Sequence, residues 1–86
     1  MAAAADGPRL TLYGRSYCHL CDEMIAGLRG LQAGFRFKLD VVDVDSDPAL
    51  ERRFGERVPV LVHDGQELCH YRLDTAAVTA LLPKIR

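Results

Sequence analysis

Two cysteines three positions apart, Cys18 and Cys21, are the side chains of this sequence best suited to chemistry. They follow a short apolar segment, 10–13, and open a segment in which Met24 and Leu28 recur with helical spacing on the face of Cys21. Cysteines at this spacing at a helix start can close a small disulfide with little backbone movement. The unpaired N–H groups and partial positive charge there favour thiolate over thiol at Cys18. The spacing therefore predicts a dithiol–disulfide exchange site.

In such a site Cys18 is the nucleophile that attacks a substrate disulfide, and the more shielded Cys21 resolves the mixed disulfide. His19 lies between them, where a protonated imidazole would favour the thiolate further.

Two other functions remain open. The pair could bind a metal ion or an iron–sulfur cluster, although a closed zinc site needs four ligands and the chain has no second close cysteine pair. The domain could also be a catalytically silent interaction module. Cys69 is expected to be a small, buried apolar side chain.

Composition narrows the class of protein. With 86 residues, 49% of them hydrophobic, the chain has material for one domain with one core. Its 11 basic and 12 acidic residues are well mixed, which argues against nucleic acid as a partner, and no apolar run approaches the length of a membrane helix. Residues 1–8 lack the features of a signal peptide and are expected to be a disordered tail before a domain at 9–86. We therefore expect a cytoplasmic monomer that binds neither nucleic acid nor membrane.

Periodicity and turn residues predict seven elements in the order β-α-β-α-β-β-α. The expected strands are 10–13, 35–42, 58–63 and 66–72. The expected helices begin at Cys18, at Pro48 behind an Asp47 cap, and after Asp74. The first two strands are joined by a helix and are therefore expected to run parallel through a crossover. The last two strands are joined by the Asp64–Gly65 turn and are expected to form a hairpin. The fold class is therefore α/β, with a four-stranded mixed sheet and three flanking helices.

This order, with Cys-x-x-Cys after the first strand and Arg57–Pro59 at the third, resembles the thioredoxin fold in its compact glutaredoxin form. The resemblance covers about 10–82 and is greatest to small bacterial glutaredoxin-like families. It implies a thiol–disulfide oxidoreductase of cell redox homeostasis. It also implies a cis bond at Pro59 and a Val58 backbone that pairs with an extended thiol substrate. The substrate-binding residues that it implies are Arg15, Tyr17, Arg57, Val58, Pro59 and Asp74.

The same resemblance bears on cofactors and partners. It implies no resident cofactor, and it implies a protein or small-molecule disulfide as substrate, with glutathione or a reductase as the electron donor. Arg15 and Asp74 match positions at which glutaredoxins contact glutathione. The Gly-Gly pair of that family, however, falls on His70 and Tyr71. Because those glycines allow a ligand to approach the backbone closely, the two rings predict weak handling of glutathione.

Overall fold

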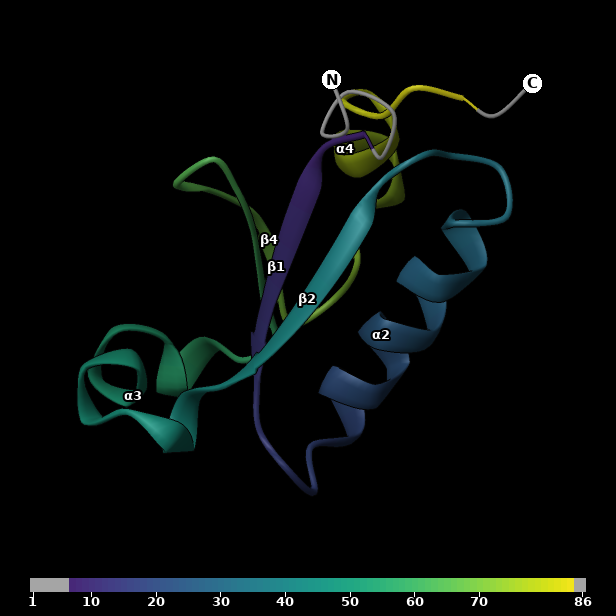
Figure 1. The fold of residues 1–86 in the computed structure, drawn as a ribbon. Helices are drawn as coiled ribbons and strands as arrows, with labels where there is room; N and C mark the ends of the chain where they lie inside the picture. Colours follow the sequence, from purple (N-terminus) through teal and green to yellow (C-terminus); the bar gives the residue numbers. More distant parts are fainter. Residues whose placement is uncertain (1–6, 85–86) are drawn as a thin grey trace.

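A four-stranded mixed sheet forms the centre of the protein, which the computed structural model describes over residues 7–84 (Figure 1). The strands are β1 (Arg9–Gly14), β2 (Lys38–Asp43), β3 (Val60–His63) and β4 (Gln66–His70), arranged in the order β2-β1-β3-β4. β1 runs parallel to β2 and antiparallel to β3, and β3 and β4 are antiparallel. The parallel crossover and the hairpin predicted from the sequence are therefore both present.

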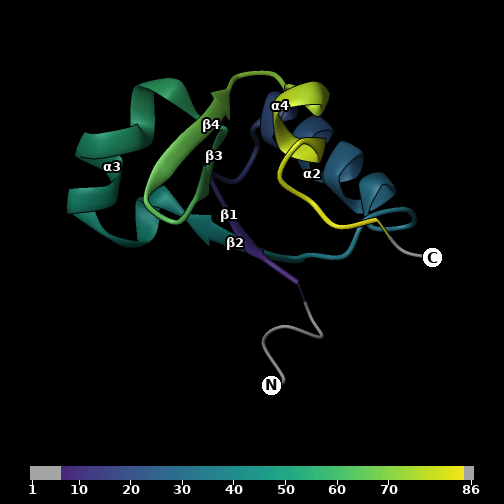
Figure 2. The same cartoon turned by 90° about the horizontal axis from the view of Figure 1, so that it is seen from above.

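Three α-helices cover the two faces of this sheet (Figure 2). α2 (His19–Leu31) and α4 (Thr75–Thr79) lie on one face, and α3 (Pro48–Phe54) lies on the other. Two short 3₁₀ helices, η1 (Val44–Ser46) and η2 (Gly55–Arg57), flank α3. The fold is an α/β thioredoxin-like arrangement with helices on both sides of a mixed sheet.

The core is divided by the sheet because successive strand residues point to opposite faces. Leu10 and Leu12 of β1 are fully buried under α2, whereas the ring of Tyr13 stacks on Phe54 of α3 with 4.2 Å between the ring centroids. The larger cluster, on the α2 side, contains Leu10, Leu12, Met24, Leu28, Phe37, Leu61, Val78 and Leu82. Packing against both faces fixes β1, the strand from which the chain turns into the cysteine motif.

β2, β3 and β4 are shorter than the sequence predicts, whereas β1, at Arg9–Gly14, is longer than the predicted 10–13. β2 begins at Lys38 because the segment before it pairs elsewhere, through a bridge between Phe35 and Lys84. β3 begins after Pro59, which has no amide to donate to a ladder. β4 ends at His70 because the next residue, Tyr71, has a left-handed backbone with φ of 63°.

The described part of the chain begins at Gly7 and ends at Lys84. The expected tail, 1–8, falls largely outside the described residues, and within the described part the carbonyl of Pro8 accepts a hydrogen bond from the amide of Lys38 at 2.8 Å. α4 ends at Thr79, and residues 85–86 lie outside the described part of the chain. Within residues 7–84, no helix combines the length and the apolar character needed to cross a membrane.

Candidate redox site

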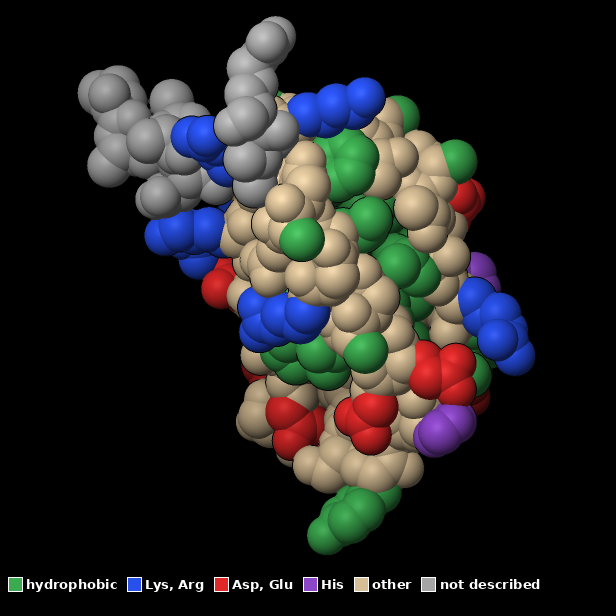
Figure 3. Space-filling model, turned by 90° about the vertical axis from the view of Figure 1, so that its right-hand side faces the viewer, with side chains coloured by type: hydrophobic (Ala, Val, Ile, Leu, Met, Phe, Trp, Pro, Cys, Tyr) green, Lys and Arg blue, Asp and Glu red, His purple; other side chains and the backbone are tan. Residues whose placement is uncertain are grey.

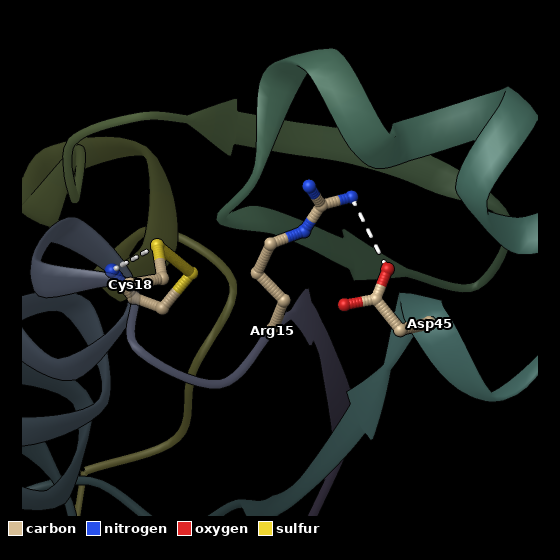
Figure 4. The surroundings of a disulfide bond; sticks show 4 residues. Arg15, Cys18 and Asp45 are labelled. Atoms are coloured by element: carbon tan, nitrogen blue, oxygen red, sulfur yellow. Dashed lines mark hydrogen bonds and ion pairs between the residues drawn. A yellow bond between two sulfur atoms is a disulfide. The ribbon is translucent and has the colours of Figure 1, made fainter.

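Cys18 and Cys21 are joined by a disulfide at the start of α2, with 5.1 Å between their Cα atoms (Figure 4). Cys18 is the N-cap residue, in an extended conformation, and Cys21 lies in the first helical turn. The backbone amide of Cys21 donates a hydrogen bond to Sγ of Cys18 at 3.1 Å. The sulfur of Cys18 thus takes the position of an N-cap acceptor, where it satisfies one of the amides that a helix end leaves without a partner.

The two sulfurs differ in their access to solvent. Cys21 is 1% exposed, whereas Cys18 is half-buried and can be reached from outside. Gly14, at the end of β1, allows the close packing of Cys21, because a Cβ atom at Gly14 would lie 3.1 Å from its Sγ. The geometry therefore presents one sulfur to a substrate and keeps the other behind it.

The Val58–Pro59 peptide bond is cis, as the resemblance implies. Because Tyr13 of β1 pairs with Val60 of β3, this bond lies at the end of the sheet from which the chain enters the cysteine motif. The carbonyl of Pro59 accepts a hydrogen bond of 2.9 Å from the amide of Tyr71. Among the described residues, the amide and carbonyl of Val58 have no backbone partner, so both can pair with an incoming extended chain.

Arg15, expected to bind substrate, forms ion pairs with acids of the protein. One Nη atom lies 3.2 Å from a carboxylate oxygen of Glu51 and 3.5 Å from one of Asp45. Figure 4 shows its guanidinium extended away from the disulfide and toward Asp45. These ion pairs thus link the segment between β1 and Cys18 to the side of the sheet on which α3 lies.

Arg57 is also engaged within the protein. Its guanidinium forms an ion pair with Glu67 of β4, donates to the carbonyl of Arg53 at 3.3 Å, and lies over the ring of Phe54. The other carboxylate oxygen of Glu67 lies 2.7 Å from Nδ1 of His70. The hydrogen bond from Arg57 and the contact with His70 hold the pKa of Glu67 below its ordinary value, against the opposing effect of burial.

The other residues predicted from the sequence to take part in the site are Tyr17, His19 and Asp74. Tyr17 is fully exposed, with φ of 58°, and His19 directs its imidazole to Glu23 at 2.8 Å, one turn along the outer face of α2. Asp74 caps α4 by accepting a hydrogen bond from the amide of Ala77 at 3.0 Å. Cys69 packs against the main core, and burial raises the pKa of its thiol, which makes it a poor nucleophile.

The structure adds two residues that the sequence did not indicate in these roles. Glu67 joins Arg57 to His70, and the hydroxyl of Tyr71 donates a hydrogen bond of 2.9 Å to the carbonyl of Glu56. Both contacts depend on the register of β4, so no local motif reveals them. Within residues 7–84, no group of three or more His, Cys, Asp or Glu side chains is arranged to hold a metal ion.

Comparison with known proteins agrees with this geometry. The model of the glutaredoxin-like domain family (DUF836) matches residues 9–83, which include the cysteine pair and the Val58–Pro59 loop. The chain belongs to this glutaredoxin-like family. The uncharacterised protein Rv0508 of Mycobacterium tuberculosis is 31% identical over 72 residues, covering 78% of this chain and 74% of that protein.

Solved structures resemble the glutaredoxin-like domain closely. Protein Ne2328 from Nitrosomonas europaea is 46% identical, with a TM-score of 0.81 over 90% of this chain and 93% of that one. Protein XcR50 from X. campestris is 42% identical, with a TM-score of 0.68 over 83% and 91%. A thioredoxin of Plasmodium falciparum has a TM-score of 0.70 over 93% and 75% at only 12% identity, which shows that the glutaredoxin-like domain shares the thioredoxin fold.

Proposed function

We propose that this glutaredoxin-like domain catalyses thiol–disulfide exchange, with Cys18 as nucleophile and Cys21 as resolving thiol. The observation that carries the proposal is the Cys18–Cys21 disulfide at the start of α2, where the half-buried Cys18 sulfur accepts the amide of Cys21. A hydrogen bond to sulfur at a helix N-terminus stabilises the thiolate, and the thiolate is the attacking species.

The reaction proceeds in two balanced steps. The Cys18 thiolate attacks one sulfur of a substrate disulfide, forms a mixed disulfide and releases the other substrate sulfur as a thiolate, which takes up a proton. The Cys21 thiol loses its proton, and the resulting thiolate attacks the Cys18 sulfur and releases the second substrate thiol. The dithiol has then lost two electrons and two protons to the substrate. The resulting Cys18–Cys21 disulfide is the form that the structure contains.

The surroundings support the order of these steps. Cys18 is partly exposed to solvent, whereas Cys21 is almost fully buried and would meet only the sulfur already attached to Cys18. The free backbone groups of Val58 would hold an extended substrate next to Cys18, and the exposed ring of Tyr17, which directly precedes Cys18, offers a further contact. His19, paired with Glu23, would modulate the charge near the sulfur from the outer face of α2.

We infer that the domain works without a resident cofactor and is recharged by an external thiol, either glutathione or a reductase protein. Such a cycle fits the cytoplasm, where thiol pools keep a dithiol of this kind reduced. The substrate would be a protein or small-molecule disulfide.

The proposal is tested by reducing the oxidised protein with glutathione and, in parallel, with a thioredoxin reductase. Mass spectrometry after thiol alkylation then follows Cys18. We expect one of the two donors to reduce the disulfide, and the reduced protein to pass its electrons to a model disulfide. A reduced protein that transfers no electrons would contradict the proposal. Stoichiometric zinc or a brown colour in the purified protein would favour metal or cluster binding instead.

A further inference from the structure

A groove of 240 Å³ opens beside the cysteine motif, between α2 and the segment that follows β4. We call it the Tyr71 groove. Its lining is Leu20, Glu23, Met24, Tyr71, Arg72 and Leu73. Leu20 is the residue between His19 and Cys21, so the groove begins within the motif itself. Figure 3, which faces the α2 side, shows recessed hydrophobic side chains along the flanks of the helix.

Tyr71 is held in place as a wall of this groove. Its amide donates to the carbonyl of Pro59 and its hydroxyl to the carbonyl of Glu56, so both ends of the residue are attached to the loop before β3. Its φ of 63° lies in a region that bulky residues seldom adopt. Of the three non-glycine residues in the described part with such a backbone, one is Asp64 in the hairpin turn, and the other two, Tyr17 and Tyr71, are aromatic residues at the redox site. Unfavourable backbone geometry of this kind is typically retained where a ligand is bound.

The charges around the groove favour a neutral occupant. Glu23 and Arg72 carry opposite formal charges, and the other four lining residues are uncharged. Arg15 and Arg57, the cations that would receive the carboxylates of glutathione, are paired with acids of the protein. The four uncharged lining side chains are aliphatic or aromatic, so they can pack against an uncharged side chain, and the groove offers no excess of positive charge to a small ligand with two carboxylates.

We propose that the Tyr71 groove receives an apolar side chain next to the disulfide cysteine of a polypeptide substrate. The proposal rests on the exchange activity proposed above, and it names the substrate class as a polypeptide rather than glutathione. The substrate chain would pair with the free backbone groups of Val58, and an apolar neighbour of its cysteine would lie against Leu20, Met24 and Tyr71. Tyr71 is then a residue that determines specificity.

The test uses two peptides that differ in one residue, phenylalanine or glycine, next to a cysteine held in a mixed disulfide with a chromogenic aromatic thiol. Attack by Cys18 on the peptide sulfur releases the aromatic thiolate, which is measured by absorbance. We expect the unaltered protein to favour the phenylalanine peptide by about tenfold in kcat/KM, the scale of one aromatic anchor. Tyr71→Gly should remove this preference, and Tyr71→Phe, which keeps the ring, should retain it.

The matched control is Asp64→Gly, which replaces a left-handed residue in the hairpin turn and should leave the preference unchanged. Glycine adopts φ of 63° freely, which offsets part of the loss of the hydrogen bond from the Tyr71 hydroxyl to Glu56, so Tyr71→Gly should still fold, with a thermal unfolding midpoint no more than a few degrees lower. If that variant nevertheless fails to fold, the two-peptide comparison on the unaltered protein decides the question. Equal kcat/KM for both peptides, or a preference for glutathione mixed disulfide over the phenylalanine peptide, would overturn the groove proposal alone. No reaction with any disulfide would overturn the exchange activity and the groove proposal together.

Discussion

The backbone amide of Cys21 lies 3.1 Å from the sulfur of Cys18, so the proposed resolving residue donates a hydrogen bond to the proposed nucleophile. This contact stabilises Cys18 as a thiolate and thereby makes the dithiol state easier to maintain. We predict that the Cys18–Cys21 couple has a reduction potential between about −270 and about −200 mV, the range from thioredoxin to glutaredoxins. Equilibration with glutathione buffers, followed by alkylation and mass spectrometry, measures the potential. A value below about −300 mV would identify a structural disulfide.

Replacement of each cysteine should give a different result. Cys21→Ser should accumulate a mixed disulfide between Cys18 and the substrate, because the attacking thiol remains and only the resolving step is lost. Cys18→Ser should abolish disulfide reduction, because Cys21 is 1% exposed and cannot reach a substrate sulfur. Mass spectrometry of both variants after incubation with one peptide disulfide provides the comparison. Equal trapping by both would show that the helix end does not distinguish the two sulfurs.

Glutathione mixed disulfides should be poor substrates as long as the side chains of His70 and Tyr71 are present. We predict weak glutathione-dependent activity for the unaltered protein and an increase of about tenfold in kcat/KM for His70→Gly combined with Tyr71→Gly. The reason is that a glutathione molecule kept from the backbone loses hydrogen bonds worth about 0.5–1.5 kcal/mol each. Turnover of a glutathionylated peptide measures the effect. The single variant His70→Gly, which keeps the Tyr71 ring, is the control and should gain little.

If the unaltered protein already processes glutathionylated peptide at the rate of an ordinary glutaredoxin, these two side chains do not obstruct the site. That outcome would also argue against the substrate class inferred from the Tyr71 groove.

Glu67 should contribute to stability in a pH-dependent manner. The hydrogen bond from Arg57 holds the pKa of Glu67 below its ordinary value of 4.5, so the folded state favours the ionised carboxylate. A lowered carboxyl pKa stabilises the fold above the unfolded-state pKa, and this contribution is lost as the pH falls through the folded-state pKa. We predict that Glu67→Gln costs less than about 1 kcal/mol at pH 7, since the pair is partly exposed and screened by solvent.

Thermal unfolding at pH 7 and at pH values below 4.5 checks this prediction, because the difference between Glu67→Gln and the unaltered protein should shrink toward zero in acid. Glu56→Gln serves as the control, since the side chain of Glu56 makes no ion pair within the described residues. A difference that stays constant across this pH range would show that the ionisation of Glu67 is not linked to folding.

The order of the elements and the disulfide pair could be predicted from the sequence because their signals are local. Cys18 and Cys21 are close in the chain, and the Asp64–Gly65 turn and the Asp47–Pro48 cap are short motifs with known geometry. The family resemblance supplied the cis bond at Pro59, which no local pattern predicts.

The charge pairing near the site could not be predicted in the same way. Arg57 and Glu67 are ten residues apart and meet through the β3–β4 hairpin, whose register shifts between Leu61 and Val62. Likewise, Arg15 meets Glu51 across 36 residues. From the sequence alone, either arginine could bind an anionic substrate. In the structure, each arginine forms an ion pair with an acidic side chain of the protein.

The chain enters and leaves the domain at the end of the sheet opposite the disulfide. Pro8 is bonded to Lys38 at the start of β2, and Lys84 is bridged to Phe35 just before that strand, whereas Cys18 follows the far end of β1. With six residues in β1, these two ends are separated by about 17 Å or more. A fluorescent label or a surface tether attached at Pro8 or at Lys84 would therefore start from the end of the sheet away from the disulfide, so the domain can be immobilised at these positions without covering the two cysteines.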